Sequence, residues 1–289
     1  MNKKFWITFI ILAAVLAAGF AFRNQLSRFY SYERLIIEKG ISDLAVNKTV
    51  KQILTPPPLR VTGGDPAAVL TRAGVIADTN TQRNINGLTS LKENRSLNDS
   101  AAAKAADMLK NQYFAHVSLS GIGVADLAKG QGYDFIIIGE NLALGNFKSD
   151  QALVQAWMDS PGHRENILNN RYSDIGVAVI KGVYEGQTVW FAVQHFGASV
   201  SSCPKIDPFL NSQIDKNKIE IQNLQENLNA LRTDIENSKP KFGNAYSQKI
   251  NEYNNEVVAY NNLVSRTKNL VSQYNSEVNA FNNCVAGIK

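Results

Sequence analysis

The residues best suited to chemistry are two histidines and one glutamate spread across the middle of the chain. The histidines are His116 and His163, and the glutamate is Glu140, in a Gly-Glu-Asn tripeptide. Imidazole and carboxylate groups can bind zinc or transfer protons. No two of these residues form a short signature such as His-Glu-x-x-His. Their spacing alone therefore favours neither a metal site nor an acid–base pair.

The sequence offers little support for nucleophilic catalysis. Ser118 and Ser160 lie close to motif histidines, but both positions are typical of turn or cap residues, and Ser160 precedes a proline. His195 follows Gln194 on a predicted strand, so the two side chains should point in opposite directions. We therefore expect His195 to face solvent.

A globular α/β domain over residues 68–199 must position these side chains. Patterning predicts a helix over residues 70–88, an alanine-rich helix opening at Ser100 and a third helix over 149–159. The apolar runs 135–138, 175–180 and 188–194 predict strands, and the last two are joined by a hairpin signal.

Several motifs of this region resemble the CAP superfamily of cysteine-rich secretory, antigen 5 and pathogenesis-related class 1 proteins. The resemblance covers about residues 69–198, under half the chain, and is strongest to the bacterial extracellular branch. The motifs occur in the family's order: Phe114-Ala-His116-Val-Ser, Gly139-Glu140-Asn141, Trp157-Met-Asp-Ser-Pro-Gly-His163-Arg164-Glu-Asn166-Ile-Leu168, Ile175-Gly176-Val177 and Gln194-His-Phe196-Gly197. It implies an α-β-α sandwich with a cleft that holds two histidines and two acidic residues.

Three members of that tetrad match His116, Glu140 and His163, which the resemblance makes the catalytic or cleft residues. The second glutamate of the family falls on Ser160, with Asp159 and Glu165 nearby as substitutes. As a set, His116, Glu140 and His163 could hold zinc with an open position for water, or act as acid and base. We expect binding or bracing roles around the cleft for five further residues: Asn141, Ser160, Arg164, Asn166 and Gln194.

The amino-terminal segment indicates in which cellular compartment the protein lies. Residues 5–22 form an apolar run with Thr8 as its only polar residue, preceded by Lys3 and Lys4. Eighteen residues span roughly 27 Å as a helix, which matches a bilayer core. Residues 1–23 are therefore a signal anchor, or alternatively a cleavable signal peptide. Either interpretation places the rest of the chain outside the cytoplasm, single-pass at the cell membrane or secreted.

The remaining segments flank the α/β domain. Residues 24–67 are predicted to be a juxtamembrane segment that ends in a Pro/Gly linker. Residues 203–289 are predicted to be an antiparallel coiled-coil hairpin, because apolar residues recur at alternating spacings of four and three on both sides of a Pro/Gly break. Cys203 and Cys284 are the only cysteines, and the hairpin brings them together as a predicted disulfide.

Composition excludes some functions and leaves three open. The net charge of +5 is modest and the basic residues are scattered, which argues against a nucleic-acid binder. The first candidate is a binding module for a small apolar, lipid-like or cell-envelope ligand. The second is a metal-assisted or acid–base hydrolase of peptide or envelope substrates, and the third is a structural or adhesive protein whose helical arm contacts a protein partner.

Overall fold

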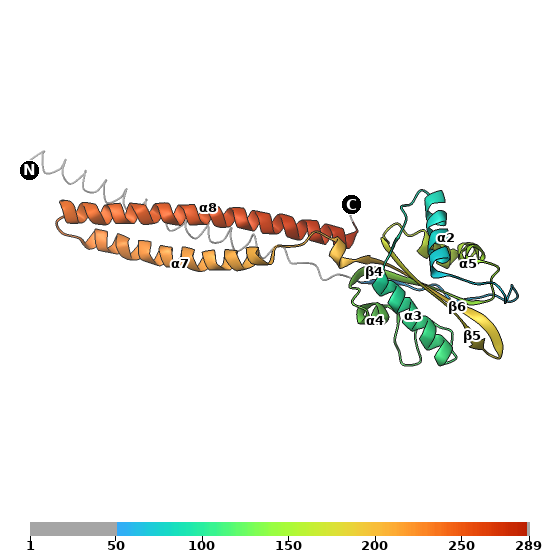
Figure 1. The fold of residues 1–289 in the computed structure, drawn as a ribbon. Coiled ribbons are helices and arrows are strands. Elements are labelled where there is room, and N and C mark those ends of the chain that lie inside the picture. Colours follow the sequence, from blue (N-terminus) through green and yellow to red (C-terminus); the bar gives the residue numbers. More distant parts are fainter. Residues whose placement is uncertain (1–50, 288–289) are drawn as a thin grey trace, which may run out of the picture. The chain divides into compact units, whose positions relative to one another are not determined.

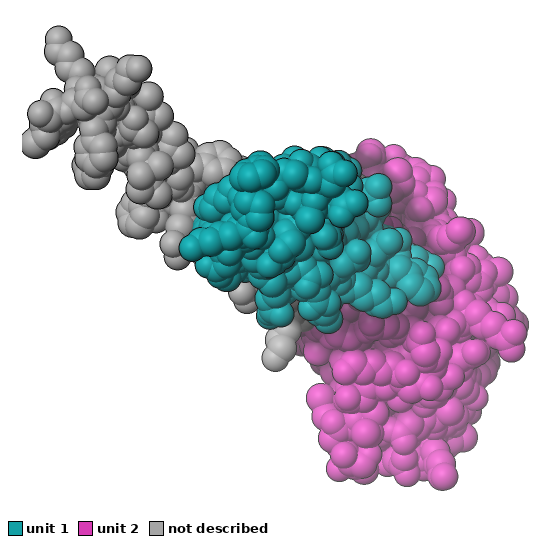
Figure 2. Space-filling model, turned by 90° about the vertical axis from the view of Figure 1, so that its left-hand side faces the viewer, with its two compact units in different colours: residues 1–47, 205–282 teal, residues 48–204, 283–289 magenta. Residues whose placement is uncertain are grey.

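The computed structural model describes residues 51–287, which divide into two units. One unit is an α/β domain and the other is a helical hairpin (Figures 1 and 2). The predicted membrane segment lies outside the described residues. Within residues 51–287, no helix is both long and apolar enough to cross a bilayer.

The α/β domain is built on one mixed sheet with the strand order β1-β4-β6-β5-β3, and β2 also pairs with β4. Its elements are β1 (Gln52–Leu54), β2 (Leu59–Arg60), α2 (Arg72–Ile85), β3 (Lys92–Glu93), α3 (Arg95–Lys110), α4 (Val124–Gly130), β4 (Phe135–Gly145), α5 (Asp150–Asp159), α6 (Pro161–Ile167), β5 (Asp174–Tyr184), β6 (Gln187–Ser199) and η1 (Val200–Ser202).

Helices cover both faces of this sheet, as the predicted α-β-α sandwich requires (Figure 1). Helices α2, α5 and α6 pack on one face around Trp157, which is fully buried. Helix α3 packs on the other face through its alanines and Met108. Both faces of β4 and most of β6 are consequently buried. This places the polar residues of these two strands inside the protein.

The Pro/Gly linker that we expected over the end of residues 24–67 is partly sheet instead. β1 and β2 pair in parallel with β4, on either side of Pro56-Pro57-Pro58. Proline favours the same extended backbone as a strand, and it is tolerated at the edge of a sheet, where its missing N–H is not needed. The composition that indicated a stiff linker is therefore equally compatible with an edge segment.

The hairpin unit consists of α7 (Pro208–Asn237) and α8 (Asn244–Ala286). The two predicted apolar seams face each other: Ile214, Ile221 and Leu228 pack against Tyr260, Val264 and Val271. Between these layers, Asn217 Nδ2 donates to Thr267 Oγ1 at 3.0 Å. A polar pair inside an apolar seam is satisfied in one register only, so the Asn217–Thr267 contact favours this pairing of the two helices.

Candidate functional site

The centre of the α/β domain is a buried carboxylate held between two imidazoles. Glu140 on β4 pairs directly with His195 on β6, and its Oε2 accepts from His195 Nε2 at 2.8 Å. Its Oε1 accepts from His116 Nδ1 at 2.6 Å. Glu140 and His195 are fully buried, and the His116 side chain is 14% exposed. The chain thus holds a His–Glu–His arrangement. Its second imidazole belongs to His195, a residue that we expected to face solvent.

The expectation for His195 was wrong because β6 lies inside the sheet with helices on both faces. Strand alternation does separate Gln194 from His195, but the face opposite to Gln194 is covered by α3. Ser100 of that helix lies 3.0 Å from His195 Nδ1 through its Oγ. Alternation predicts which face a residue takes, and it does not predict whether that face is covered.

Hydrogen-bond partners surround both ring nitrogens of His116 and both carboxylate oxygens of Glu140. His116 Nε2 donates to the carbonyl oxygen of Pro56, which can only accept, and Nδ1 contacts the Glu140 carboxylate. Burial by itself raises the pKa of Glu140, but the hydrogen bonds and charges of His116 and His195 outweigh it, and the pKa lies below the ordinary 4.5.

Lys104 supports the same centre from α3, a role that the sequence analysis missed. Its side chain is almost fully buried, and Nζ donates to the His116 backbone carbonyl at 2.8 Å and to the Tyr113 hydroxyl at 3.2 Å. Burial lowers the pKa of Lys104, while the charge of Glu140 opposes that shift. A signal was present in the sequence, because Ser100 and Lys104 lie four residues apart on a helix that is otherwise rich in alanine.

His163 lies in a separate, less polar environment at the start of α6. Its Nδ1 is 2.8 Å from Ser160 Oγ, whereas its buried Nε2 makes no hydrogen bond. Burial lowers the pKa of His163 to about 4, with the charge of His116 acting in the same direction. The Leu142 carbonyl opposes the shift, and the same carbonyl accepts from Trp157 Nε1 at 3.3 Å.

Three of the five residues expected to brace the cleft, Asn141, Asn166 and Gln194, form a buried amide network on the opposite face of the sheet. Asn141 Nδ2 donates to the His163 carbonyl at 3.1 Å and to Gln194 Oε1 at 3.2 Å, and Asn166 Nδ2 donates to Asn141 Oδ1 at 3.0 Å. Gln194 in turn donates to Thr79 Oγ1 at 2.7 Å. These contacts fix the β4–α6 geometry.

Two further contacts support the motif around His163 and the strand position before Glu140. Arg164 Nε donates to the Met158 carbonyl, so this residue braces the turn between α5 and α6. A Cβ at Gly139 would lie 2.1 Å from the Tyr172 hydroxyl, so only glycine fits before Glu140.

The proposed substitutes for the missing family glutamate, Asp159 and Glu165, do not join the His–Glu–His centre. Asp159 accepts from Gln155, and Glu165 lines a surface pocket.

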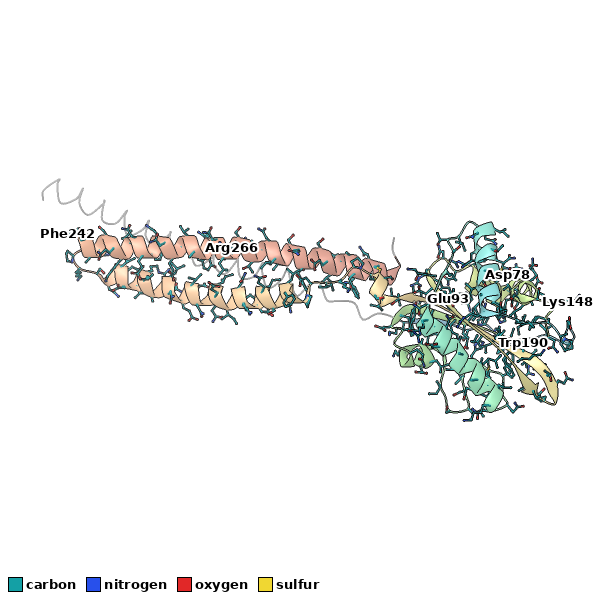
Figure 3. The ribbon with its side chains drawn as sticks, in the orientation of Figure 1. Asp78, Glu93, Lys148, Trp190, Phe242 and Arg266 are labelled. Atoms are coloured by element: carbon teal, nitrogen blue, oxygen red, sulfur yellow. A yellow bond between two sulfur atoms is a disulfide. The ribbon has the colours of Figure 1, made fainter. Side chains whose placement is uncertain are left out.

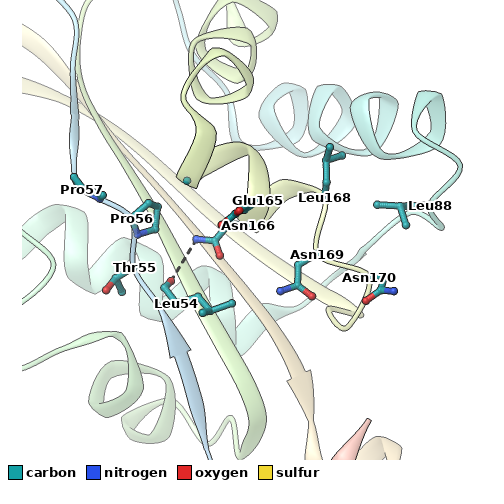
Figure 4. A pocket seen from close by; sticks show the side chains of 11 residues that line it. Leu54, Thr55, Pro56, Pro57, Leu88, Glu165, Asn166, Leu168, Asn169 and Asn170 are labelled. Atoms are coloured by element: carbon teal, nitrogen blue, oxygen red, sulfur yellow. Dashed lines mark hydrogen bonds between the residues drawn. The ribbon is translucent and has the colours of Figure 1, made fainter. Parts of the chain in front are cut away.

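That pocket lies between α6 and the amino-terminal edge segment and has a volume of about 600 Å³ (Figure 4). Leucine and proline side chains line it from two sides, with asparagine and glutamate side chains between and beside them. The lining residues are Leu54, Thr55, Pro56, Pro57, Leu88, Gly162, Glu165, Asn166, Leu168, Asn169 and Asn170.

Comparisons with known proteins agree with this architecture. Residues 76–196 match the cysteine-rich secretory protein family, CAP. This segment is a CAP domain. Two relatives from Bacillus subtilis are 39% identical over 116 residues ("Uncharacterized protein YkwD") and 35% identical over 106 residues ("Uncharacterized membrane protein YlbC"). The alignments cover 40% and 37% of this chain and only 43% and 30% of the relatives, so the chain spans less than half of either.

Two solved structures are similar to part of this chain. An extracellular protein with an SCP domain from Bacillus anthracis is 30% identical with a TM-score of 0.39, covering 44% of this chain and 40% of its own. A cysteine-rich secretory protein from Staphylococcus aureus is 21% identical with a TM-score of 0.32, covering 44% of this chain and 38% of its own.

The CAP centre of this chain does not fit the zinc site that its residue types suggested. Both oxygens of Glu140 and both nitrogens of His116 have protein partners, and His163 hydrogen-bonds to neither. No group of three or more His, Cys, Asp or Glu residues within 51–287 is arranged to hold a metal ion. Within the expected set of three, His116 and Glu140 hydrogen-bond to each other, and His163 Nδ1 instead lies 2.8 Å from Ser160 Oγ.

The lowered pKa of His163 predicts an acid-sensitive CAP domain. The folded pKa is about 4 against an ordinary 6.5, so the unfolded chain binds the extra proton between these values and stability falls as pH drops through this window. We expect His163 to lower the free energy of unfolding of the wild type by about 3 kcal/mol between pH 7 and pH 4. The free energy of unfolding of His163→Gln, measured with urea, should therefore fall by about 3 kcal/mol less than that of the wild type over the same pH range.

Ser160→Ala is the matched control for this measurement. It removes the hydrogen-bond partner of Nδ1 but keeps the imidazole, so its stability should still fall between pH 6.5 and 4. Parallel pH profiles for the wild type and His163→Gln would contradict the assignment.

Proposed function

We propose that this chain is an extracytoplasmic CAP-domain protein, tethered to the membrane by residues 5–22, that binds a small apolar or cell-envelope ligand. The membrane proposal is supported by the apolar run in the sequence and by a relative whose name describes it as a membrane protein. The extracytoplasmic proposal is supported by the disulfide between Cys203 and Cys284, because such bonds persist in oxidising compartments.

One observation carries the binding role, namely the contrast between the closed His–Glu–His centre and the open pocket beside it. Glu140, His116 and His195 use all of their polar side-chain atoms on one another and on Ser100 and Pro56. The pocket instead presents leucine and proline surface next to the exposed Glu165 and Asn170 side chains. An apolar wall with a few polar groups is the usual make-up of a small-molecule site.

The hydrolase candidate has weaker support. Ser160 and His163 are within hydrogen-bonding distance at 2.8 Å, as a nucleophile and its base would be. However, the pKa of His163 is about 4, so it is a poor base near neutral pH, and no carboxylate orients its Nε2. The same pair serves as a turn contact at the start of α6.

The adhesive candidate is favoured by one feature of the hairpin turn. Phe242 is 76% exposed between α7 and α8, and Lys239 and Lys241 beside it are also exposed (Figure 3). An aromatic flanked by cations can contact an anionic or aromatic partner surface. Retention of the purified chain on isolated cell envelopes should fall with Phe242→Ser and remain with Phe209→Ser, whose phenylalanine is 75% exposed on α7.

The binding role is tested by extracting the full chain, purified from the cells that produce it, and analysing the extract by mass spectrometry. A small molecule should be present in near-stoichiometric amount with the wild type. Leu88→Asp places a charge in the apolar wall and should reduce that amount by about tenfold.

The matched control is Leu119→Asp, at a leucine that is 78% exposed and does not line the pocket. It should carry the same molecule as the wild type. If no extracted species distinguishes Leu88→Asp from Leu119→Asp, the pocket is not the binding site.

A further inference from the structure

Residues 51–61, which we call the strap, lie before the CAP domain in the sequence but along the edge of its sheet. The family match begins only at residue 76. β1 pairs with residues 137–139 of β4 and β2 with residues 143–144, so residues 55–58 pass the part of β4 that carries Glu140. The strap is therefore an additional segment laid against the CAP domain at its histidine–glutamate centre.

The domain contacts the strap backbone at several points with side chains as well as with β4. Asn166 Nδ2 donates to the Leu54 carbonyl at 3.3 Å, and His116 Nε2 donates to the Pro56 carbonyl. The Val61 amide donates to a β4 carbonyl, that of Leu144, at 2.9 Å. Backbone pairing along an exposed sheet edge is how many domains bind extended peptides.

Side chains of the strap also have specific receptors on the domain. The Arg60 guanidinium lies 5.3 Å from the Phe114 ring centre and 5.4 Å from that of Tyr184, whose hydroxyl accepts from Nη2 at 3.2 Å. Lys51 Nζ lies 4.7 Å from the Phe135 ring centre and is paired with Asp134. Cation–aromatic contacts of this kind give side-chain selectivity.

The apolar and proline positions complete the pattern. Three strap side chains pack partly buried against the domain core: Leu54, Leu59 and Val61. The Pro56 ring lies directly over Gly162, where an added Cβ would come within 2.7 Å of the Pro56 Cβ. Three successive prolines hold the chain extended before it binds, which lowers the entropy lost on binding.

We propose that this edge of the CAP domain is a binding groove for an extended, proline-containing peptide, and that the strap occupies it in cis as a built-in competitor. Selectivity comes from a leucine before the prolines and a leucine–arginine pair after them. The strap residues Leu54, Pro56 and Pro57 also line the small-molecule pocket, so displacing the strap would open one side of that pocket. The test below needs no bound small molecule, so its outcome is separate from that of the proposed function. Displacing the strap frees the β4 edge and removes the Pro56 carbonyl from His116.

Histidine modification gives a direct readout, because the full chain has only three histidines. Carbethoxylation of each is measured by peptide mass spectrometry. In Gly162→Ala the new Cβ collides with Pro56, and in Leu59→Asp the strap loses an apolar contact. We expect His116 to react at least about tenfold faster in both variants, because it has lost the acceptor that holds its Nε2 proton. His195 should remain protected.

The matched control is Gly130→Ala, where an added Cβ meets nothing within 4 Å. Its His116 should react like that of the wild type. Adding a synthetic peptide with the sequence of residues 51–61 to Leu59→Asp should restore protection of His116, whereas a version with the three prolines replaced by glycine should restore less. Neither peptide should protect His116 in Gly162→Ala as well, because the added Cβ excludes the first proline of the peptide as it does Pro56.

Unchanged far-UV circular dichroism and continued protection of His195 establish that the released variants are folded. Two results would overturn the proposal: His116 reacting at the wild-type rate in both folded variants, or an exposed His116 in Leu59→Asp that the 51–61 peptide does not protect. Restoration by the glycine peptide to the same extent would reject the proline preference.

Discussion

Glu140→Gln should destabilise the CAP domain by about 3 kcal/mol at pH 7, because it leaves two buried imidazoles facing an uncharged amide. The wild-type carboxylate accepts from His116 at 2.6 Å and from His195 at 2.8 Å, and both contacts lie inside the domain. A glutamine amide supplies one acceptor and one donor, so one of the two N–H groups then meets a donor. Urea unfolding followed by tryptophan fluorescence measures this loss, since Trp157 and Trp190 both lie in the domain.

The same variant has a pH signature whose sign follows from the Glu140 pKa. That pKa is below the ordinary 4.5 in the folded domain, so the stabilisation by the carboxylate is present above pH 4.5 and is lost as pH falls through the folded pKa. The difference between the wild type and Glu140→Gln should therefore shrink as the pH falls from 4.5 through the folded pKa of Glu140. Glu165→Gln, at an exposed glutamate, should change stability by less than about 0.5 kcal/mol. Equal losses in the two variants would refute the central role of Glu140.

Periodic features of the chain could be predicted from the sequence because they arise from local repeats. The expected hairpin over 175–194 is β5 and β6, and the helix expected over 149–159 is α5. The apolar seams of residues 210–281 face each other along α7 and α8. In each case the side chains that face the core recur at the period of the element, so the pattern survives without knowledge of the tertiary fold.

Features that depend on tertiary contacts could not be predicted in this way. The apolar run 135–138 indicated a strand that ends before Gly139, yet β4 continues to Gly145, with Glu140 and Asn141 inside it. Polar residues extend a buried strand only when partners from other elements satisfy them, here His195 from β6 and Asn166 from α6. Neither partner is identifiable from local sequence, and the same holds for the contact between Pro56 and His116.

Replacing Cys203 and Cys284 by serine should destabilise the helical hairpin by about 4 kcal/mol, the largest change that we expect for the arm. The bond links residues separated by 81 positions, and the closed loop contains all of α7 and most of α8. Without it, the unfolded loop regains the freedom that the cross-link removed, and a longer loop regains more. Far-UV circular dichroism during urea unfolding follows the hairpin, since these two helices contribute most of the helical residues.

Tryptophan fluorescence separates this effect from the CAP domain in the same titration. Trp157 and Trp190 lie outside the closed loop, so their transition should shift much less than the helical signal, and the two transitions should separate. Wild-type protein treated with a reductant should behave like the double variant, because both lack the same cross-link. Coincident transitions in the double variant, or a helical transition that does not respond to reductant, would mean that packing along the two seams already fixes the hairpin and that the disulfide adds nothing to it.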